Sequence, residues 1–166
     1  GAVVIDADAV AAQVVHDAAD RIEAEFGPGL VSQGEVNRSA LAELVFHDSD
    51  ALARLEGIVH PEVARRVAAE KAAHSTNEVV VYDVALLTEK GLAQQFDRVV
   101  VVQAPIEQRL ARLKERGLNR EQALARIARQ ATDCDRAAIA DIVVNNDGSL
   151  QGLREAAAEV WQTLAP

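Results

Sequence analysis

The sequence predicts an α/β fold in which a parallel sheet is covered by helices. Short runs rich in valine recur at residues 2–5, 78–83, 98–102 and 142–144, and such nearly continuous apolar runs are typical of strands buried on both faces. Segments with helical periodicity separate these runs, as in a sheet of parallel strands joined by helices. The length of 166 residues suits one domain around a single core, so we expect one domain over residues 1–166.

The first element is the strand at residues 2–5, which ends at Asp6. Two helical segments follow, over residues 7–15 and 18–26, and the sequence Gly27-Pro28-Gly29 ends the second because glycine and proline disfavour a helix. Residues 30–35 are expected to form a turn around Gly34.

Capping residues mark the next two helices. Asn37 can N-cap a helix over residues 38–46, and Asp48 or Ser49 can cap a longer one that carries its apolar residues from Leu52 to Val67.

In the second half of the chain, the strands at 78–83, 98–102 and 142–144 alternate with helices. Helical pattern covers residues 106–115, 120–130 and, after the last strand, 150–164.

Composition excludes several classes of protein. A net charge of −9 argues against a general nucleic-acid binder, which needs a basic face. No run of about 18 apolar residues occurs, so no membrane partner is expected. The single cysteine, Cys134, fits a reducing compartment, which predicts a cytoplasmic protein.

Polar residues follow three of the strands, which is the position of the ligand in open parallel sheets. These residues are Asp6, Asp83 and the segment Asn145-Asn146-Asp147. Asp6 and Asp8 flank the start of a helix, where two carboxylates can bind Mg²⁺ or accept a proton from an attacking hydroxyl. The alternative is that one of them only caps the helix.

Three further groups carry candidate chemistry. The segment from Asp83 to Glu89 suits the lining of a pocket for an organic substrate. The alternative is that the segment only connects a strand to a helix and that its leucines lie in the core. Arg109, Arg112 and Arg116 recur at helical spacing, so they share one face of a helix. In small kinases such a face stabilises the charge of the transferred phosphoryl group. The alternative is a helix face that is only exposed to solvent. His60-Pro61 is a substrate contact or a helix kink.

In order along nearly the whole chain, these segments resemble the dephospho-coenzyme A kinase family, which has a P-loop kinase fold with a parallel sheet, a helical lid and a CoA-binding region. Val3-Val4-Ile5-Asp6-Ala7-Asp8 is similar to its Asp-Ala-Asp segment. The other similar segments are Asn37-Arg38-Ser39-Ala40-Leu41, Leu55-Glu56-Gly57-Ile58-Val59-His60-Pro61, Asp83-Val84-Ala85-Leu86-Leu87-Thr88-Glu89, Arg126-Ile127-Ala128-Arg129-Gln130 and Ala140-Asp141-Ile142-Val143-Val144-Asn145-Asn146.

The resemblance implies ATP-dependent phosphorylation of the ribose 3′-hydroxyl of dephospho-CoA, the last step of coenzyme A biosynthesis, with ATP and Mg²⁺. Asp8 would be the general base and Asp6 its neighbour near Mg²⁺, with no residue assigned as a metal ligand. His60, Asp83, Leu86, Leu87 and Glu89 would line the dephospho-CoA pocket. The lid, approximately residues 109–136, would supply Arg109, Arg112 and Arg116, and Asn146 would lie near the adenine.

The chain departs from the family pattern at four places. The Gly-x-x-Gly-x-Gly-Lys-Ser loop and the first strand do not occur in residues 1–166 and are expected before Gly1. Ala12 replaces an arginine, the usual Pro-Gly turn after Val14-Val15 is missing, and the lid is one residue short before Gly117. A smaller change is Ala85 in place of a proline. Two alternatives therefore stand beside the leading hypothesis. One is another P-loop small-molecule kinase, and the other is a non-catalytic nucleotide- or CoA-binding protein.

Overall fold

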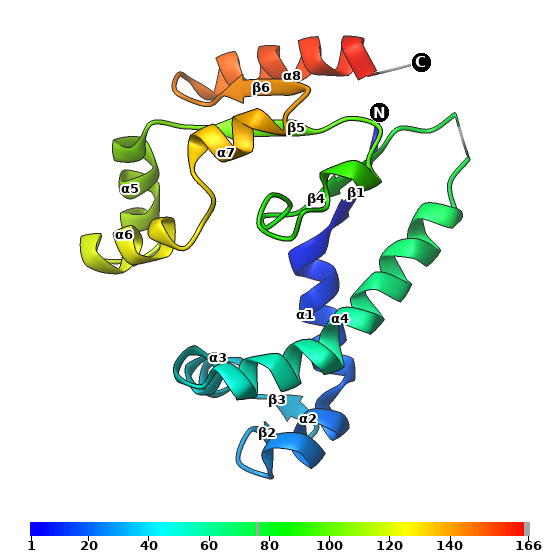
Figure 1. Cartoon of the computed structure of the whole chain (residues 1–166), viewed down its shortest axis with the longest axis vertical. Helices are drawn as coiled ribbons and strands as arrows, with labels where there is room; N and C mark the ends of the chain where they lie inside the picture. The colour runs from blue at the N-terminus through cyan, green and yellow to red at the C-terminus, as the bar shows by residue number, and fades with distance from the viewer. Residues whose placement is uncertain (76, 165–166) are drawn as a thin grey trace. The chain divides into compact units, whose positions relative to one another are not determined.

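A computed structural model describes residues 1–75 and 77–164 of the chain (Figure 1). The strands are β1 (Val3–Asp6), β2 (Val31–Ser32), β3 (Glu35–Val36), β4 (Val80–Asp83), β5 (Val100–Gln103) and β6 (Ile142–Asn145). The helices are α1 (Ala7–Asp17), α2 (Ala19–Phe26), α3 (Arg38–His47), α4 (Ser49–Ala72), α5 (Ile106–Glu115), α6 (Arg120–Ala128), α7 (Asp133–Ala138) and α8 (Leu150–Leu164), with a short 3₁₀ helix η1 at Ala93–Gln95.

The strands pair in three two-stranded sheets. β1 runs parallel to β4, and its last residue, Asp6, pairs with Asp83. β5 runs parallel to β6, and Gln103 pairs with Asn145. β2 and β3 form an antiparallel hairpin. The α/β class and the parallel strands flanked by helices are as the sequence predicts.

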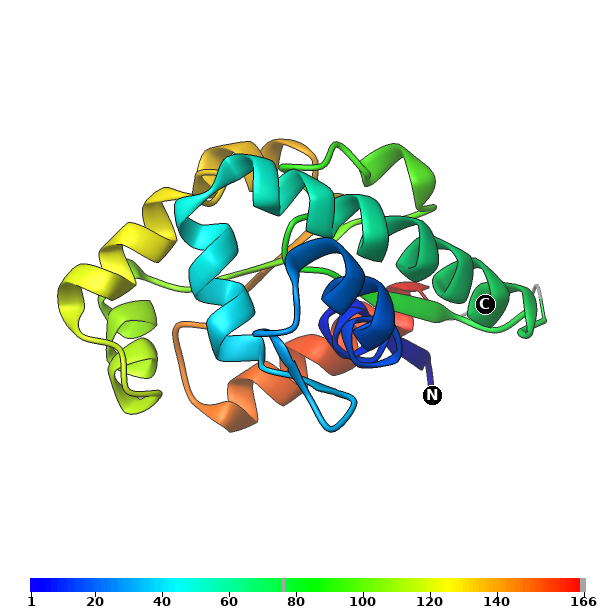
Figure 2. The same ribbon diagram turned by 90° about the horizontal axis from the view of Figure 1, so that it is seen from below.

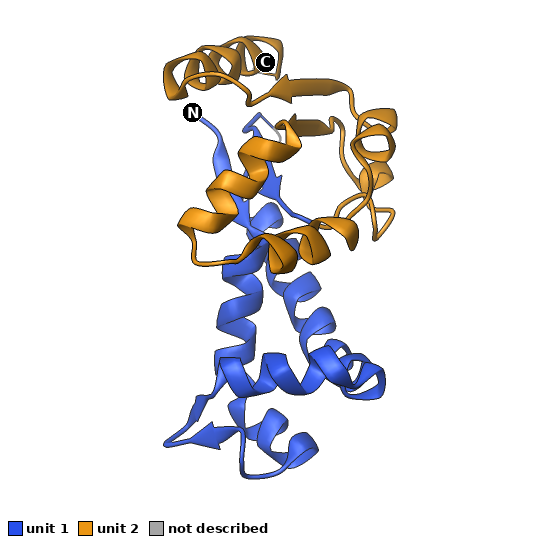
Figure 3. Ribbon diagram, turned by 90° about the vertical axis from the view of Figure 1, so that its left-hand side faces the viewer, with its two compact units in different colours: residues 1–85 blue, residues 86–166 orange. Residues whose placement is uncertain are grey.

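The chain groups into two compact units, Gly1–Ala85 and Leu86–Pro166 (Figure 3). The prediction of one domain over residues 1–166 stays a prediction, because a compact unit need not be an independent domain.

Helices α1 to α4 enclose the core of the first unit. Val14 of α1 and Ile22 of α2 are fully buried, and Leu41, Ile58 and Val59 pack with them from α3 and α4. α1 lies against α4, as the dark blue and teal helices show in Figure 2. This packing sets the position of α1, whose first turn carries Asp8.

In the second unit, one side chain fixes where β5 and β6 begin to pair. The Asp141 carboxylate accepts a hydrogen bond of 2.7 Å from the Val99 amide, and the Val99 carbonyl accepts from the Asp141 amide at 2.9 Å. α8 packs on β6, and α7 packs on β5.

Most of the predicted elements are confirmed, and two regions differ. The segment expected to be a turn around Gly34 is the β2–β3 hairpin, in which Gln33 and Gly34 both have positive φ. Such a pair of central residues is what a two-residue hairpin of the favoured twist requires. Helix α7 was not predicted at all, because six residues are too few to show a helical period.

Pro61 lies inside α4, which continues unbroken from Ser49 to Ala72.

Among the described residues, no helix is both long enough and apolar enough to cross a lipid bilayer.

Candidate active site

The paired aspartates lie where β1 passes into α1. Asp6 is the N-cap of α1, and its Oδ1 accepts a hydrogen bond of 2.9 Å from the Ala9 amide. The capping alternative is therefore correct for Asp6, although its second carboxylate oxygen is not used by the cap.

Asp8 is exposed in the first turn of α1 and makes no hydrogen bond or ion pair with any residue in the described part of the chain. Burial, and after it the negative charge of Asp8, raises the pKa of the Tyr82 hydroxyl, which places Tyr82 within electrostatic reach of Asp8. An exposed carboxylate at a helix start is free to accept a proton from a bound hydroxyl.

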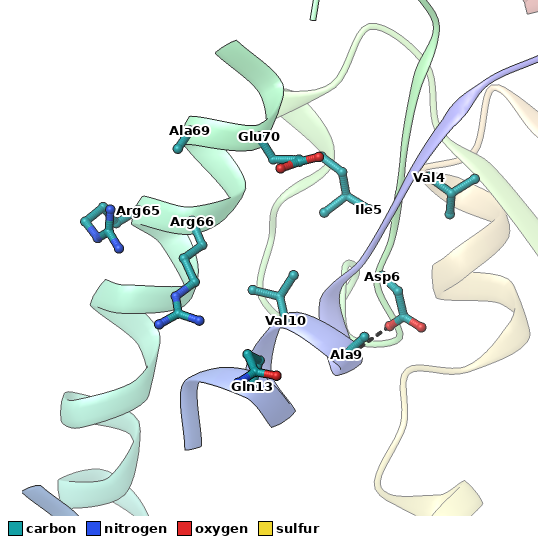
Figure 4. Close-up of a pocket in the computed structure, with 10 residues that line it drawn as sticks. All are labelled: Val4, Ile5, Asp6, Ala9, Val10, Gln13, Arg65, Arg66, Ala69 and Glu70. Atoms are coloured by element: carbon teal, nitrogen blue, oxygen red, sulfur yellow. Dashed lines mark hydrogen bonds between the residues drawn. The ribbon is translucent and has the colours of Figure 1, made fainter. Parts of the chain in front are cut away.

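A surface pocket of about 650 Å³ opens beside Asp6, between β1, α1 and α4 (Figure 4). Val4, Ile5 and Val10 supply apolar walls, and Arg65, Arg66 and Glu70 of α4 supply charged ones. Asp6 also lines the pocket, so a ligand held there would lie beside one of the paired aspartates.

The charges of this pocket are largely neutralised by the protein itself. Arg66 donates to Glu62 and to Asp17, each at 2.8 Å, and Arg65 makes two hydrogen bonds to Glu62. Hydrogen bonds from Arg65 and then Arg66 lower the pKa of Glu62 to about 2. This network was not among the predicted features, although the i, i+3 and i, i+4 spacing of Glu62 with the two arginines indicates it.

Two more predicted site residues belong to the first unit. Asp83 is the strand partner of Asp6, so both lie at the carboxyl end of the β1–β4 pair, as predicted. His60 is half-exposed on α4, with its Nε2 3.6 Å from the carboxylate of Glu56.

The other predicted substrate residues, Leu86, Leu87 and Glu89, open the second unit. Leu86 is 43% exposed, so its side chain does not belong to the core. The Glu89 carboxylate accepts a hydrogen bond of 2.7 Å from the Ala131 amide, between α6 and α7. Glu89 therefore holds the end of the predicted lid, a contact across 42 positions that no local pattern indicates.

The three predicted arginines have different surroundings. Arg109 is only 20% exposed, and it donates to Gln130 at 3.2 Å and to Asp133 at 3.3 Å. Asp133 also pairs with Arg136, and its backbone carbonyl accepts from Gln103 at 2.9 Å. Arg109 thus joins α5 to Gln130, between α6 and α7, and to the first residue of α7.

Arg112 donates to both the backbone and the side-chain oxygen of Asn146, each at 3.2 Å. The structure therefore brings together two residues that the sequence assigned separately to the ATP side. Arg116 is exposed at the end of α5, and within residues 1–75 and 77–164 its side chain has no hydrogen-bond or ion-pair partner.

No group of three or more histidine, cysteine, aspartate or glutamate side chains within the described residues is arranged to hold a metal ion.

Comparison with known proteins gives one consistent family. The family model for dephospho-CoA kinase (CoaE) matches residues 1–152. A dephospho-CoA kinase of Frankia casuarinae is 47% identical over 168 residues, covering 99% of this chain and 73% of that protein. One from Thermobifida fusca is 44% identical over 169 residues, covering 99% of this chain and 84% of that protein.

Solved structures agree with these relatives. The crystal structure of TT1252 from Thermus thermophilus aligns with a TM-score of 0.86 at 36% identity, over all of this chain and 86% of that one. Dephospho-CoA kinase from Campylobacter jejuni aligns with a TM-score of 0.76 at 26% identity, over 99% of this chain and 86% of that one.

Proposed function

The chain belongs to the dephospho-CoA kinase family, and from that premise we propose that it transfers the γ-phosphoryl group of ATP to the ribose 3′-hydroxyl of dephospho-CoA. This reaction is the last step of coenzyme A biosynthesis. The observation that carries the mechanism is the exposed carboxylate of Asp8, two residues past the strand end, which has no hydrogen-bond or ion-pair partner among the described residues.

Asp8 acts as the general base. The 3′-hydroxyl oxygen attacks the γ-phosphorus as the bond from that phosphorus to the bridging oxygen of ADP breaks, and the hydroxyl proton passes to Asp8. The products are coenzyme A and ADP. Because phosphoryl transfer needs mainly positioning and charge stabilisation, one carboxylate that orients the hydroxyl is sufficient on this side.

Asp6 would help to hold Mg²⁺ through the carboxylate oxygen that the helix cap leaves unused. When bound, Mg²⁺ neutralises charge on the transferring phosphates. Asp6 keeps its own position through the cap on α1, which also fixes the first turn around Asp8.

The acceptor side comprises His60, Asp83, Leu86, Leu87 and Glu89, and the ATP side comprises Arg109, Arg112, Arg116 and Asn146. Arg116, whose guanidinium has no partner among the described residues, is the arginine best able to contact phosphate oxygens directly. We also propose a cytoplasmic location, which the exposed free thiol of Cys134 supports.

Dephospho-CoA-dependent release of ADP from ATP tests the activity. Asp8→Asn is expected to lower kcat by a factor of about 10² to 10⁴, the range for loss of a general base, with little change in KM for either substrate. The matched control is Asp20→Asn, which makes the same change in the first turn of α2 at an exposed position.

Three results would oppose the proposal in whole or in part. ADP release that depends on adenylate, shikimate or a nucleoside instead of dephospho-CoA would identify another small-molecule kinase. Binding of ATP or dephospho-CoA without turnover would identify a non-catalytic binding protein. An Asp8→Asn variant as active as Asp20→Asn would remove Asp8 from the mechanism while leaving the activity in place.

A further inference from the structure

We infer that Gln108 and Arg112 act together as a positioning pair, holding the loop after β6 in the place where it contacts the adenine of ATP. The inference rests on the proposed function, because the adenine contact of Asn146 comes from the family resemblance. It assigns a role to Gln108, which neither the sequence analysis nor the comparisons single out, and a different role to Arg112.

The two side chains lie one turn apart on α5 and reach the same loop. Gln108 Nε2 donates to the backbone carbonyl of Asp147 at 2.6 Å. Arg112 Nη2 donates to the backbone carbonyl and the side-chain oxygen of Asn146, and it also donates to Gln108 Oε1 at 3.2 Å. Each member therefore holds one loop residue, and the pair is joined by its own hydrogen bond.

The first residue of the loop is also held by the sheet. The Asn146 amide donates to the Gln103 carbonyl at 2.7 Å, continuing the β5–β6 pairing by one residue. Asn146 is thus held by β5 on its backbone amide and by Arg112 on both its oxygens. With both oxygens of Asn146 accepting from Arg112, the amide nitrogen of the same side chain is the group left to face a base.

The Arg112 guanidinium therefore holds the loop in position and does not neutralise phosphate charge. The Nη2 group of Arg112 has two hydrogens and three acceptors within 3.2 Å, so contact with a phosphate through that group would require these bonds to be exchanged. Arg109, by contrast, has its partners in the segment before and within α7. Arg112 alone among the three predicted arginines reaches the loop after β6.

Steady-state kinetics separates a positioning role from a role in the transition state. Gln108→Met and Arg112→Met each remove the hydrogen bonds and keep an unbranched side chain on α5. We expect each to raise KM for ATP about fivefold to tenfold, with kcat and KM for dephospho-CoA within about twofold of wild type. Lys114→Met is the charge-matched control on the same helix, and it should leave KM for ATP unchanged.

The selectivity of the enzyme for adenine over guanine is a second measurement, and a variant that is only less stable would not change it. If the loop contacts the adenine, both variants should lose part of the preference for ATP over GTP, measured as the ratio of the two kcat/KM values. The effects of Arg112→Met and Asn146→Ala should also overlap in the double variant, because both break the same contact.

Two results would overturn the inference. The first is a fall in kcat of a hundredfold or more for Arg112→Met with KM for ATP unchanged, which would place Arg112 on the transferred phosphoryl group. The second is KM for ATP and the ATP-to-GTP ratio of Gln108→Met both within twofold of wild type. If Arg112→Met does not fold, as judged by its circular dichroism spectrum, the neutral Gln108→Met variant decides alone.

Binding of a fluorescent ATP analogue to the same variants needs no acceptor, so it separates this inference from the proposed function. Failure of wild type to use dephospho-CoA would refute the kinase assignment alone. Weaker analogue binding by Gln108→Met than by Lys114→Met would still support the positioning pair, and equal binding would overturn it.

Discussion

Ile22 provides the most direct test of how the first unit is held together. Its side chain is completely buried among Val14, Leu41, Ile58 and Val59, so it joins α2 to the three helices that surround it. Replacement by alanine removes three carbon atoms from the centre of this cluster. At about 0.8 kcal/mol for each buried methylene-sized group, the lost transfer free energy is about 2.4 kcal/mol.

The cavity that remains adds to this cost, because surrounding helices relax only partly, and the total is expected to be about 3–4 kcal/mol. That is a large part of the free energy of unfolding of a typical domain, about 5–15 kcal/mol. Urea unfolding followed by circular dichroism should therefore show a much lower midpoint for Ile22→Ala with an unchanged slope.

Ile106→Ala is the matched control, because Ile106 is 48% exposed at the start of α5. The same chemical change there should cost less than about 1 kcal/mol. A cost at Ile22 no larger than the cost at Ile106 would refute the assignment of the core to the cluster of α1 to α4.

Two further predictions concern polar contacts. Because arginine hydrogen bonds lower the pKa of Glu62 to about 2, its contribution to stability is present above its ordinary pKa of about 4.5 and is lost as the pH falls towards 2. Glu62→Gln should flatten this part of the acid dependence, measured by urea unfolding between pH 7 and pH 2.5; an unchanged profile would contradict the pairing. Asp141→Ala removes the acceptor of the Val99 amide, and hydrogen exchange at that amide should become about tenfold faster. Exchange at the wild-type rate would show that the carboxylate does not hold the start of β5.

The sequence predicts best those features whose cause lies within a few residues. Asn37 was predicted as an N-cap, and Asp48 as one of two candidates beside Ser49; Asn37 and Asp48 accept hydrogen bonds from the first turns of α3 and α4. The same local chemistry could have revealed α7, because Thr132 and Asp135 form a capping box at its start. A search for capping boxes would therefore have found a helix too short for periodicity.

Features formed across the fold could not be predicted in this way. Periodicity and spacing compare residues of one element, whereas Arg112 and Asn146 are 34 positions apart, and Glu89 and Ala131 are 42 apart. The sequence supplies the residue types proposed for the ATP and acceptor sides, but the structural partner of each residue depends on packing between elements. The hairpin of β2 and β3 was missed for a local reason, since Gln33-Gly34 is not a common hairpin turn.

The hydrogen-bond partners of the three arginines also determine which of them can bind a ligand. The spacing of Arg109, Arg112 and Arg116 places them on one helix face. A guanidinium that already donates to protein oxygens, as those of Arg109 and Arg112 do, must break these hydrogen bonds before it can bind a ligand. Each broken bond costs about 1 kcal/mol or more. Arg116 has no such bond to exchange among the described residues. Phosphate contact would therefore be least costly for Arg116, whereas Arg109 holds Gln130 and the start of α7, and Arg112 holds the loop after β6.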